Sequence, residues 1–569
     1  MILKGIYEAM AIANGGRQVL TKMASEMQRE LSVAYNYSLV GQNVRQCDTH
    51  AGMWENLHAK SISARDFKTT KRKNHRAAGK IQKREYSTKS FSPSQDFGTG
   101  AGSGSNSGPL RRVSKHIIGS KKPNTAQMTS SEVPSSRLAR IFHYGSLAAG
   151  MGLGAATQGI KQYASGKPTA INMKSLFLSP QNIERMAKKF SKMRGAALKI
   201  GQMMSFQDSS ILPTEIRQVL LRVQNSAHYM PPGQLERVMV NDLGINWRER
   251  LFTSFEDVPV AAASIGQVHN AVTEDLTPVV VKVQYPGVAT SIDSDLNNLL
   301  MLLTASSILP AGLFLDKTIA NARTELKWEC DYIREAQNLI RFRDILKDDD
   351  VFEVPRVFHR LCGEHVLTME RMRGIEIVKG NWDQKTKDWI ATNIMRLCLL
   401  EIKKFKFMQT DPNWANFLYN ESTGKIELLD FGAARDFSDA FVEDYVNVLR
   451  AAVKKDRDSV EHYSKKLGYL TGLESPHMVK AHVDSVMVLG EAFSPVDNKG
   501  KPFDFKQQTV TDRVRDNIGV MLSERLTPPP EETYSLHRKL SGVFLLCARL
   551  NATVPCEKLF EEIVGFDDK

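Results

Sequence analysis

The chain has 569 residues, more than a single ordinary core accommodates, so we expect about two to four domains. Its composition, 42% hydrophobic and 24% charged, excludes a chain that is mostly disordered. The net charge of +13 lies mostly in residues 1–90, which hold 16 Lys and Arg against 7 Asp and Glu. The rest of the sequence has no basic patch interleaved with aromatic residues, which argues against nucleic-acid binding.

Residues 1–86 have the composition of a mitochondrial presequence. Between residues 65 and 84, nine Lys and Arg stand against Asp66 alone, and transit peptides are basic and poor in acid. The tetrapeptide Arg-Glu-Tyr-Ser at 84–87 resembles a matrix-peptidase site that is cut before the serine. A basic unfolded tail is the alternative. Residues 87–140, with their run of Gly and Ser, are predicted to be a flexible linker.

Residues 141–160 carry no formal charge, and about twenty residues is the length that a helix needs to cross a bilayer. We therefore predict a candidate transmembrane helix there, with a helix lying on a surface or a flexible segment as the alternative, because the run is rich in Gly and Ala. Gly150 and Gly154 have the spacing that lets two membrane helices approach closely, which predicts a homodimer through this helix.

Residues 176–250 are predicted to form an N-terminal helical extension. Apolar residues recur at steps of three and four over 181–206, which indicates a helix with one buried face. Lys199 and Gln202 lie together on a neighbouring face, where an ordinary solvated lysine is the plainer interpretation. The six cysteines have no Cys-x-x-Cys or zinc spacing and are typical of buried free thiols in a reducing compartment.

Residues 258–285 predict strands around a tight turn made of Ala261, Ala262, Ala263 and Ser264. The turn lies where a kinase has its glycine-rich phosphate loop, although alanine gives up part of the freedom of glycine. Lys282 interrupts the β-branched strand over 279–285, and a lone buried charge is costly unless it is paired. A helix predicted over 323–336 offers four acidic partners, which are Glu325, Glu329, Asp331 and Glu335.

A strand predicted over 365–372 leads into the position of a kinase hinge, and a helix over 389–404 leads to a polar loop. In that loop Asp411 and Asn416 are five residues apart, and Asp430 closes the next apolar run before Phe-Gly. Phosphoryl transfer needs one Asp for the attacking hydroxyl or water, and an Asn and a second Asp for magnesium on the nucleotide phosphates. Protein kinases space these groups in the same way, and three solvated turn residues are the alternative.

Taken in order, these motifs resemble those of the UbiB family of atypical kinases (AarF-domain-containing kinases), specifically its mitochondrial coenzyme Q branch. The matching motifs are Lys-Ile-Gly-Gln at 199–202, Ala-Ala-Ala-Ser-Ile-Gly-Gln-Val-His at 261–269, Val-Lys-Val-Gln-Tyr-Pro-Gly at 281–287, Glu-Cys-Asp at 329–331, Gln-Thr-Asp-Pro-Asn-Trp at 409–414 and Leu-Asp-Phe-Gly at 429–432. They span about residues 180–435, and no motif position departs from the family's pattern.

The resemblance implies an α+β, two-lobed protein-kinase-like fold, with an N-lobe at 251–370, a C-lobe at 371–569 and the helical extension over the active site. It implies binding of ATP or ADP with Mg²⁺. The implied roles are phosphate binding for Lys282, paired with Glu335; a catalytic base at Asp411; magnesium ligands at Asn416 and Asp430; the turn of Ala261, Ala262, Ala263 and Ser264 over the phosphates; a hinge at Met369, Glu370, Arg371 and Met372; and a contact from Lys199 to Glu329 and Asp331.

The resemblance also implies an atypical kinase or ATPase that supports coenzyme Q biosynthesis on the matrix face of the inner mitochondrial membrane. The implied partners are proteins of the coenzyme Q biosynthetic complex, anionic membrane lipids and lipid precursors. No Ala-Pro-Glu follows Asp430-Phe-Gly, so a peptide-docking segment is missing and a protein substrate is disfavoured. A nucleotide-gated scaffold with little chemistry and a conventional protein kinase are the alternatives.

Overall fold

The computed structural model describes residues 129–130, 137–164, 179–193, 228–305, 315–411, 413–506 and 509–567, all within one compact unit. The predicted presequence, most of the predicted linker, and Lys199 with its motif lie outside these residues. The short strands β1 (Thr129–Ser130) and β2 (His228–Tyr229) pair in parallel.

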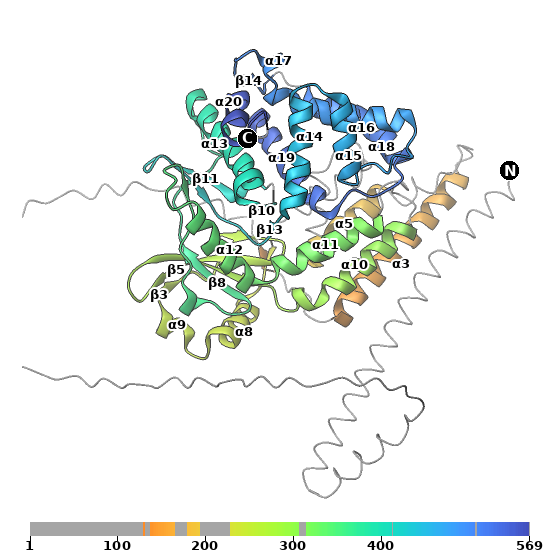
Figure 1. Ribbon diagram of the computed structural model, residues 1–569. Helices are drawn as coiled ribbons and strands as arrows, with labels where there is room; N and C mark the ends of the chain where they lie inside the picture. The colour runs from red at the N-terminus through yellow and green to blue at the C-terminus, as the bar shows by residue number, and fades with distance from the viewer. Residues whose placement is uncertain are drawn as a thin grey trace, which may run out of the picture. The chain divides into compact units, whose positions relative to one another are not determined.

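An antiparallel sheet with the strand order β3-β5-β6-β8 forms the N-terminal lobe (Figure 1). Its strands are β3 (Phe252–Phe255), β5 (Gly266–Thr273), β6 (Pro278–Gln284) and β8 (Val366–Glu370), and β4 (Ala261–Ala262) pairs with β5. Val279, Val281 and Val283 of β6 are fully buried, and Lys282 between them points to the opposite face because side chains alternate along a strand. This places one lysine on the inner surface of the lobe.

Three helices support this sheet. Helix α8 (Pro232–Leu243) packs against β6 and β8, α9 (Trp247–Leu251) leads into β3, and α12 (Tyr332–Ile345) contacts β8. Helix α12 buries Leu339 and Phe342, which are fully inaccessible, along with Glu335, a carboxylate that requires a cationic partner at such a position. The N-terminal lobe therefore buries a lysine on a strand and a glutamate on a helix.

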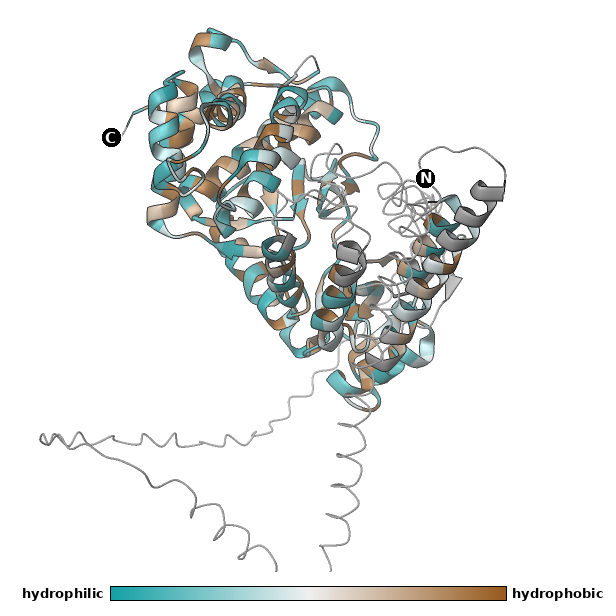
Figure 2. Cartoon of the chain, turned by 90° about the vertical axis from the view of Figure 1, so that its right-hand side faces the viewer, coloured by the Kyte–Doolittle hydropathy of each residue, from teal (hydrophilic) through white to brown (hydrophobic). Residues whose placement is uncertain are grey.

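The C-terminal lobe is mainly helical. Its helices are α13 (Gln384–Leu400), α14 (Asp439–Val453), α15 (Arg457–Lys466), α16 (Pro476–Gly490), α17 (Pro495–Asn498), α18 (Val510–Glu524), α19 (Glu531–Arg549) and α20 (Cys556–Ile563). The short helices η3 (His359–Leu361), η4 (Glu401–Phe405), η5 (Trp414–Asn416) and η6 (Glu491–Phe493) interrupt the connections. Figure 2 shows that the helices carry both hydrophilic and hydrophobic residues, as amphipathic helices do.

Short strands bring the polar loops of this lobe together. A four-stranded sheet has the order β7-β12-β11-β9, and two separate pairs join β10 to β13 and β14 to β15. The strands are β7 (Phe352–Glu353), β9 (Ile375–Glu376), β10 (Phe407–Gln409), β11 (Phe417–Asn420), β12 (Lys425–Leu428), β13 (Ala434–Asp436), β14 (Phe503–Asp504) and β15 (Thr553–Val554). The antiparallel pairing of β11 with β12 places Asn416, just before β11, and Asp430, just after β12, at the same end of this strand pair.

Helix starts in this lobe follow from capping residues in the sequence. Asp383, Ser438, Asp456 and Ser475 each accept a hydrogen bond from a backbone N–H of the first turn of α13, α14, α15 and α16, respectively. Helix α13 continues into η4, which is a turn of π-helix and ends at Lys406 in the left-handed region (φ 50°). Such turns are rare and frequently lie at functional sites, and this one directly precedes β10.

The long helix that precedes the predicted extension packs against the first helix of that extension and against a helical insertion of the N-terminal lobe. Helix α3 (Arg137–Ala164) contacts α5 (Pro180–Met193) and α10 (Val288–Ala305), and α10 contacts α11 (Leu315–Glu329). Tyr144, Leu147 and Met151 of α3 are buried in these contacts. The candidate membrane span over 141–160 thus lies in a helix, but none of the helices in the described part of the chain is both long and apolar enough to cross a bilayer.

The prediction of a single helix over 323–336 is wrong, because the helix is interrupted at residues 330 and 331, between α11 and α12. Asp331 takes the N-cap position of α12 and accepts a hydrogen bond from the N–H of Arg334. The carbonyl of Cys330 accepts a 2.8 Å hydrogen bond from the side chain of Gln284 in β6. The break therefore separates Glu325 and Glu329, on α11, from Glu335 on α12.

Candidate active site

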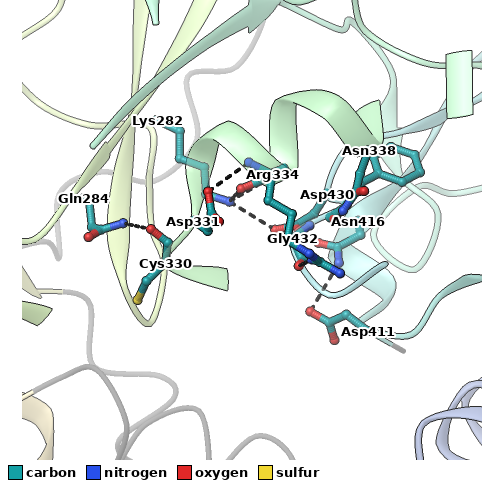
Figure 3. A network of polar contacts seen from close by, with 12 residues as sticks. Lys282, Gln284, Cys330, Asp331, Arg334, Asn338, Asp411, Asn416, Asp430 and Gly432 are labelled. Carbon is teal, nitrogen blue, oxygen red and sulfur yellow. Dashed lines mark hydrogen bonds and ion pairs between the residues drawn. The ribbon is translucent and has the colours of Figure 1, made fainter. Parts of the chain in front are cut away.

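Lys282 lies at the centre of a buried ion-pair network between the two lobes (Figure 3). Its Nζ is 2.8 Å from both carboxylate oxygens of Glu335 and 3.5 Å from Oδ2 of Asp430. The side chain of Glu335 is fully buried, whereas that of Asp430 remains 34% exposed. The structure therefore brings together three groups that are 53 and 148 residues apart along the chain.

Each charged group in this network stabilises the charged form of its oppositely charged partners. Burial alone would lower the pKa of Lys282, but the carboxylates of Asp430 and Glu335 raise it well above its usual value. Burial raises the pKa of Glu335, and the ammonium group of Lys282 opposes that rise. The lysine thus stays protonated and presents one positive charge toward Asp430, which is the partly exposed member of the set.

Asp411 and Asn416 lie together in the loop between β10 and β11. The carboxylate of Asp411 accepts hydrogen bonds from the N–H of Asn413 (3.1 Å) and from Nδ2 of Asn416 (3.4 Å). Asn413 also caps η5, where its side chain accepts from the N–H of Ala415. Because the amide nitrogen of Asn416 donates to Asp411, its oxygen is the atom available to a cation.

Helix α12 anchors the segment that follows Asp430. Arg334 donates to the carbonyl of Gly432 at 2.8 Å and to that of Ala434, and Asn338 donates to the carbonyl of Phe431 at 3.0 Å. The ring of Phe431 is buried against Phe342 of the same helix, with centroids 4.5 Å apart. The helix that supplies Glu335 therefore also fixes the backbone beside Asp430.

The residues present fit a magnesium ion bound together with a nucleotide. Asn416 and Asp430 offer one amide and one carboxylate oxygen, and Mg²⁺ usually takes one or two carboxylates plus substrate phosphates and waters. Among the described residues no group of three or more His, Cys, Asp or Glu is placed to hold a metal by itself. The ion would thus depend on the phosphates for part of its coordination shell, and it would neutralise their charge.

The alanine turn is pinned to the sheet beneath it. The N–H of Ala263 donates to the carbonyl of Gly266 (2.8 Å), and the carbonyl of Ile265 accepts from the N–H of Tyr285 (2.9 Å). Ser264 and Ile265 are both buried. These hydrogen bonds hold the tip of the turn in place. The glycine-rich loop that protein kinases have at this position would have more conformational freedom.

The predicted hinge residues continue directly from the sheet. Met369 is buried opposite Val280, Glu370 pairs with Val279, and the N–H of Arg371 donates to the carbonyl of Pro278. Met372 follows without a ladder partner. The segment lies where β8 leaves the sheet and enters the C-terminal lobe, and its outer side is paired up to Glu370, because Met369 bridges Val357 and the N–H of Glu370 donates to the carbonyl of Arg356.

The structure separates the two acids of the Glu-Cys-Asp motif. Glu329 ends α11 and is buried, whereas Asp331 is exposed and serves as the cap of α12. Lys199, which was predicted to reach both acids, is not among the described residues. Its contact with them stays a prediction.

Sequence reasoning missed three cations that act on the backbone of this site. Arg334 holds the segment after Asp430, and Arg538 and Lys539 of α19 reach the loop before Asp411. A signal for Lys539 existed, because it falls on the same helix face as Leu536 and Val543, where an apolar residue is expected. No local signal distinguishes Arg334 from a solvated helix arginine.

Comparison with known proteins places the chain among atypical kinases. Residues 222–464 match the model of the ABC1 atypical kinase-like domain. The chain is 61% identical over 442 residues to the mitochondrial atypical kinase COQ8 of Saccharomyces cerevisiae, covering 77% of this chain and 87% of that protein. It is 47% identical to the mitochondrial atypical kinase COQ8B of Danio rerio, covering 76% of this chain and 69% of that protein.

Among solved structures, the complex of Rv3197 with erythromycin from Mycobacterium tuberculosis is 24% identical in sequence. The match covers 68% of this chain and 98% of that one, with a TM-score of 0.48. The family match, together with a five-stranded sheet followed by a helical lobe, confirms the kinase-like α+β fold predicted from the motifs.

Proposed function

The chain belongs to the ABC1 (UbiB) family of atypical kinases, and from this premise we propose that it binds Mg-ATP between its lobes and transfers or hydrolyses the terminal phosphate. The observation that carries the proposal is the position of Lys282, bonded to Glu335 and 3.5 Å from Asp430. Kinases need this lysine–glutamate pair and the metal-binding aspartate in place at the same time.

Each group then has a role that its position supports. Lys282 would bind the nucleotide phosphates, Asn416 and Asp430 would bind magnesium, and Asp411 would orient the hydroxyl or water that attacks. The alanine turn would cover the phosphates, and the backbone from Met369 to Met372 would hold the adenine ring. Catalysis of this kind consists mainly of positioning and charge stabilisation, which a rigid buried network supplies.

The acceptor in this proposal is a small molecule, a lipid or water, and not a protein. After Gly432 the chain enters β13 at Ala434, pairs with β10, and begins α14 at Asp439. This short path leaves no segment of the length on which protein kinases dock a peptide. Because its relatives are named mitochondrial COQ8 kinases, we propose that the protein acts in mitochondria, on the matrix face of the inner membrane. There it would support coenzyme Q biosynthesis, with proteins of that pathway and anionic lipids as partners.

The test is phosphate release from Mg-ATP by the full chain, with and without liposomes that contain anionic lipid. Asp430→Asn should abolish release, and Asp436→Asn, which removes an exposed carboxylate six residues on, should leave it unchanged. Nucleotide binding without release in either condition would contradict the proposal and favour a scaffold gated by nucleotide.

The pathway is tested separately. The full chain should restore the coenzyme Q content of a Saccharomyces cerevisiae strain that lacks its own COQ8, and the Asp430→Asn variant should not. Equal restoration by both proteins would mean that the phosphoryl chemistry is dispensable for the pathway role.

A further inference from the structure

Helix α19 carries two adjacent cations that reach consecutive carbonyls just before Asp411. Lys539 donates to the carbonyl of Gln409 at 2.8 Å, and Nε of Arg538 lies 3.5 Å from the carbonyl of Thr410. The side chains of Arg538 and Lys539 are 6% and 2% exposed. In Figure 1, α19 lies beside α13, in the part of the lobe that also holds β10. Both cations thus act on main-chain atoms, and they do so from outside the matched family domain.

The opposite side of the same stretch is held by Glu401 of η4. Its Oε1 accepts from the N–H of Gln409 at 3.1 Å, and its Oε2 lies 3.1 Å from Nζ of Lys539. A buried ion pair therefore binds both the N–H and the carbonyl of Gln409. The hydroxyl of Thr410 adds a 2.7 Å hydrogen bond to the carbonyl of Ala433. Each of the two residues before Asp411 is tied by at least two contacts.

Helix α19 also holds the loop after Asp411. Nε1 of Trp414 donates to the carbonyl of Gly542, one turn beyond Lys539, at 3.2 Å. The loop is thus fastened to a single helix on both sides of the aspartate, whose own side chain stays partly exposed. A fastening of this form fixes the backbone position of Asp411 without covering its carboxylate.

Arg538 has a second partner on the other side of the site. Its Nη2 lies 2.8 Å from Oε1 of Glu325 on α11, and both side chains are 6% exposed. Burial alone would lower the pKa of Arg538, but the carboxylates of Glu325, Asp411 and Glu329 raise it above its usual value. The guanidinium group therefore links the loop of Asp411 to the helix that ends in the Glu-Cys-Asp motif.

Hydrophobic residues of similar volume replace many buried ion pairs without loss, so a positioning role has to come from what these two pairs hold. Here the cations bind the backbone of one loop at successive residues. We infer that Arg538 and Lys539 are positioning residues that hold Asp411 against the phosphoryl acceptor, an inference that rests on the proposed function of the site.

The test uses full-length double variants that remove both charges of each pair, so that no buried charge is left alone. These are Arg538→Met with Glu325→Gln, and Lys539→Met with Glu401→Gln. Arg538→Lys is the conservative variant, because lysine keeps the charge but cannot bond Glu325 and Thr410 together. Arg450→Met is the matched control, because Arg450 is also buried and likewise binds two successive carbonyls, those of Val564 and Gly565, which lie outside the loop.

Two readouts are expected to change in the double variants. The kcat for ATP hydrolysis should fall about 10- to 100-fold, with KM and the Kd for Mg-ADP within about threefold of the parent, because misplacing a catalytic group acts on turnover and not on nucleotide binding. Backbone amides of residues 407–417 should exchange hydrogen about tenfold faster, whereas those of 366–372 should not change. Arg450→Met should show neither effect, and Arg538→Lys should be intermediate.

Parent-like exchange and turnover in both double variants would overturn the inference, as would a loss of turnover that Arg450→Met reproduces. If the parent itself releases no phosphate, the proposed function fails, and hydrogen exchange alone then decides whether α19 holds the loop. Parent-like exchange of residues 407–417 would overturn the inference in that case too.

Discussion

The Nζ of Lys282 lies 2.8 Å from both carboxylate oxygens of Glu335, whose side chain has no exposed surface. Replacing Glu335 by Gln should lower kcat/KM for ATP hydrolysis by about 100-fold, because Lys282 loses the partner that aims it at the phosphates. Asp344→Asn, an exposed change on the same helix, is the control. Steady-state kinetics with less than about a threefold change in Glu335→Gln would contradict the role of the pair.

Arg334 fixes the backbone on the C-terminal side of Asp430. Arg334→Met should weaken the binding of Mg-ADP by about tenfold and leave the binding of metal-free ADP unchanged, since in the proposed site Asp430 binds the metal ion and not the adenine ring. Arg341→Met, seven residues further on α12 and paired with exposed Asp436, tests for a general effect of losing an arginine. Calorimetric titrations with and without magnesium that change in parallel would refute this prediction.

The alanine turn is expected to set the relative affinity for ATP and ADP. Ala263→Gly gives the turn freedom worth about 0.5–1 kcal/mol, so the ratio of the two dissociation constants should change by about threefold. Calorimetry with ADP and a non-hydrolysable ATP analogue measures that ratio. Unchanged affinities for both nucleotides would show that the turn does not shape the phosphate site.

The ion pair between Arg140 of α3 and Asp295 of α10 has no exposed side-chain surface. Arg140→Met should destabilise the fold by about 3–5 kcal/mol, because it leaves a buried carboxylate without its partner, and adding Asp295→Asn should restore part of the loss. Burial already raises the pKa of Asp295 to about 6, against the effect of Arg140. Protonation of Asp295 at pH 5 should therefore make the loss of stability in Arg140→Met smaller than at pH 8. The free energy of unfolding in urea, measured at both pH values, tests this.

One buried and one half-buried histidine, His482 and His537, predict a loss of stability in acid. Burial lowers the pKa of His482 to about 3 and that of His537 to about 4, so both are neutral in the folded protein. A pKa depressed on folding gives stability that is fully present above the unfolded value of about 6.5 and is lost as the pH falls toward the folded value, by about 2 kcal/mol for each histidine at pH 5.

The measurement is the change in the free energy of unfolding between pH 7.5 and pH 5. His537→Phe keeps an aromatic ring between Tyr445 and Tyr469 and should lose less stability over this interval than the parent. His462→Phe, at an exposed position, should keep the parent's dependence. Identical pH dependence in all three proteins would exclude His537 as a cause.

The sequence predicts the local parts of this site and not its supports. Asp411, Asn416 and Asp430 lie close along the chain, and the lone charge of Lys282 in an apolar strand demands a partner, so both features are visible in the residues. The choice among Glu325, Glu329, Asp331 and Glu335 needed the family resemblance, because the helix break at Cys330, whose carbonyl accepts a hydrogen bond from a distant strand, is not visible in the sequence pattern. Arg538 and Lys539 act across about one quarter of the chain, and the helical periodicity around Lys539 indicates that it is buried but not which residue it contacts.

The separation of Lys539 from Gln409 by 130 residues has a consequence for the order in which the protein is made. Ribosomes add about 5–20 residues per second, so the loop of Asp411 leaves the ribosome several seconds before the helix that fastens it exists. A chain that ends before Glu531 would carry Lys282, Glu335 and Asp430 but no α19. The proposed nucleotide site and the helix that fastens its loop are therefore synthesised at different times, and an unfinished chain has the residues proposed to hold ATP before it has those proposed to fix the reacting loop.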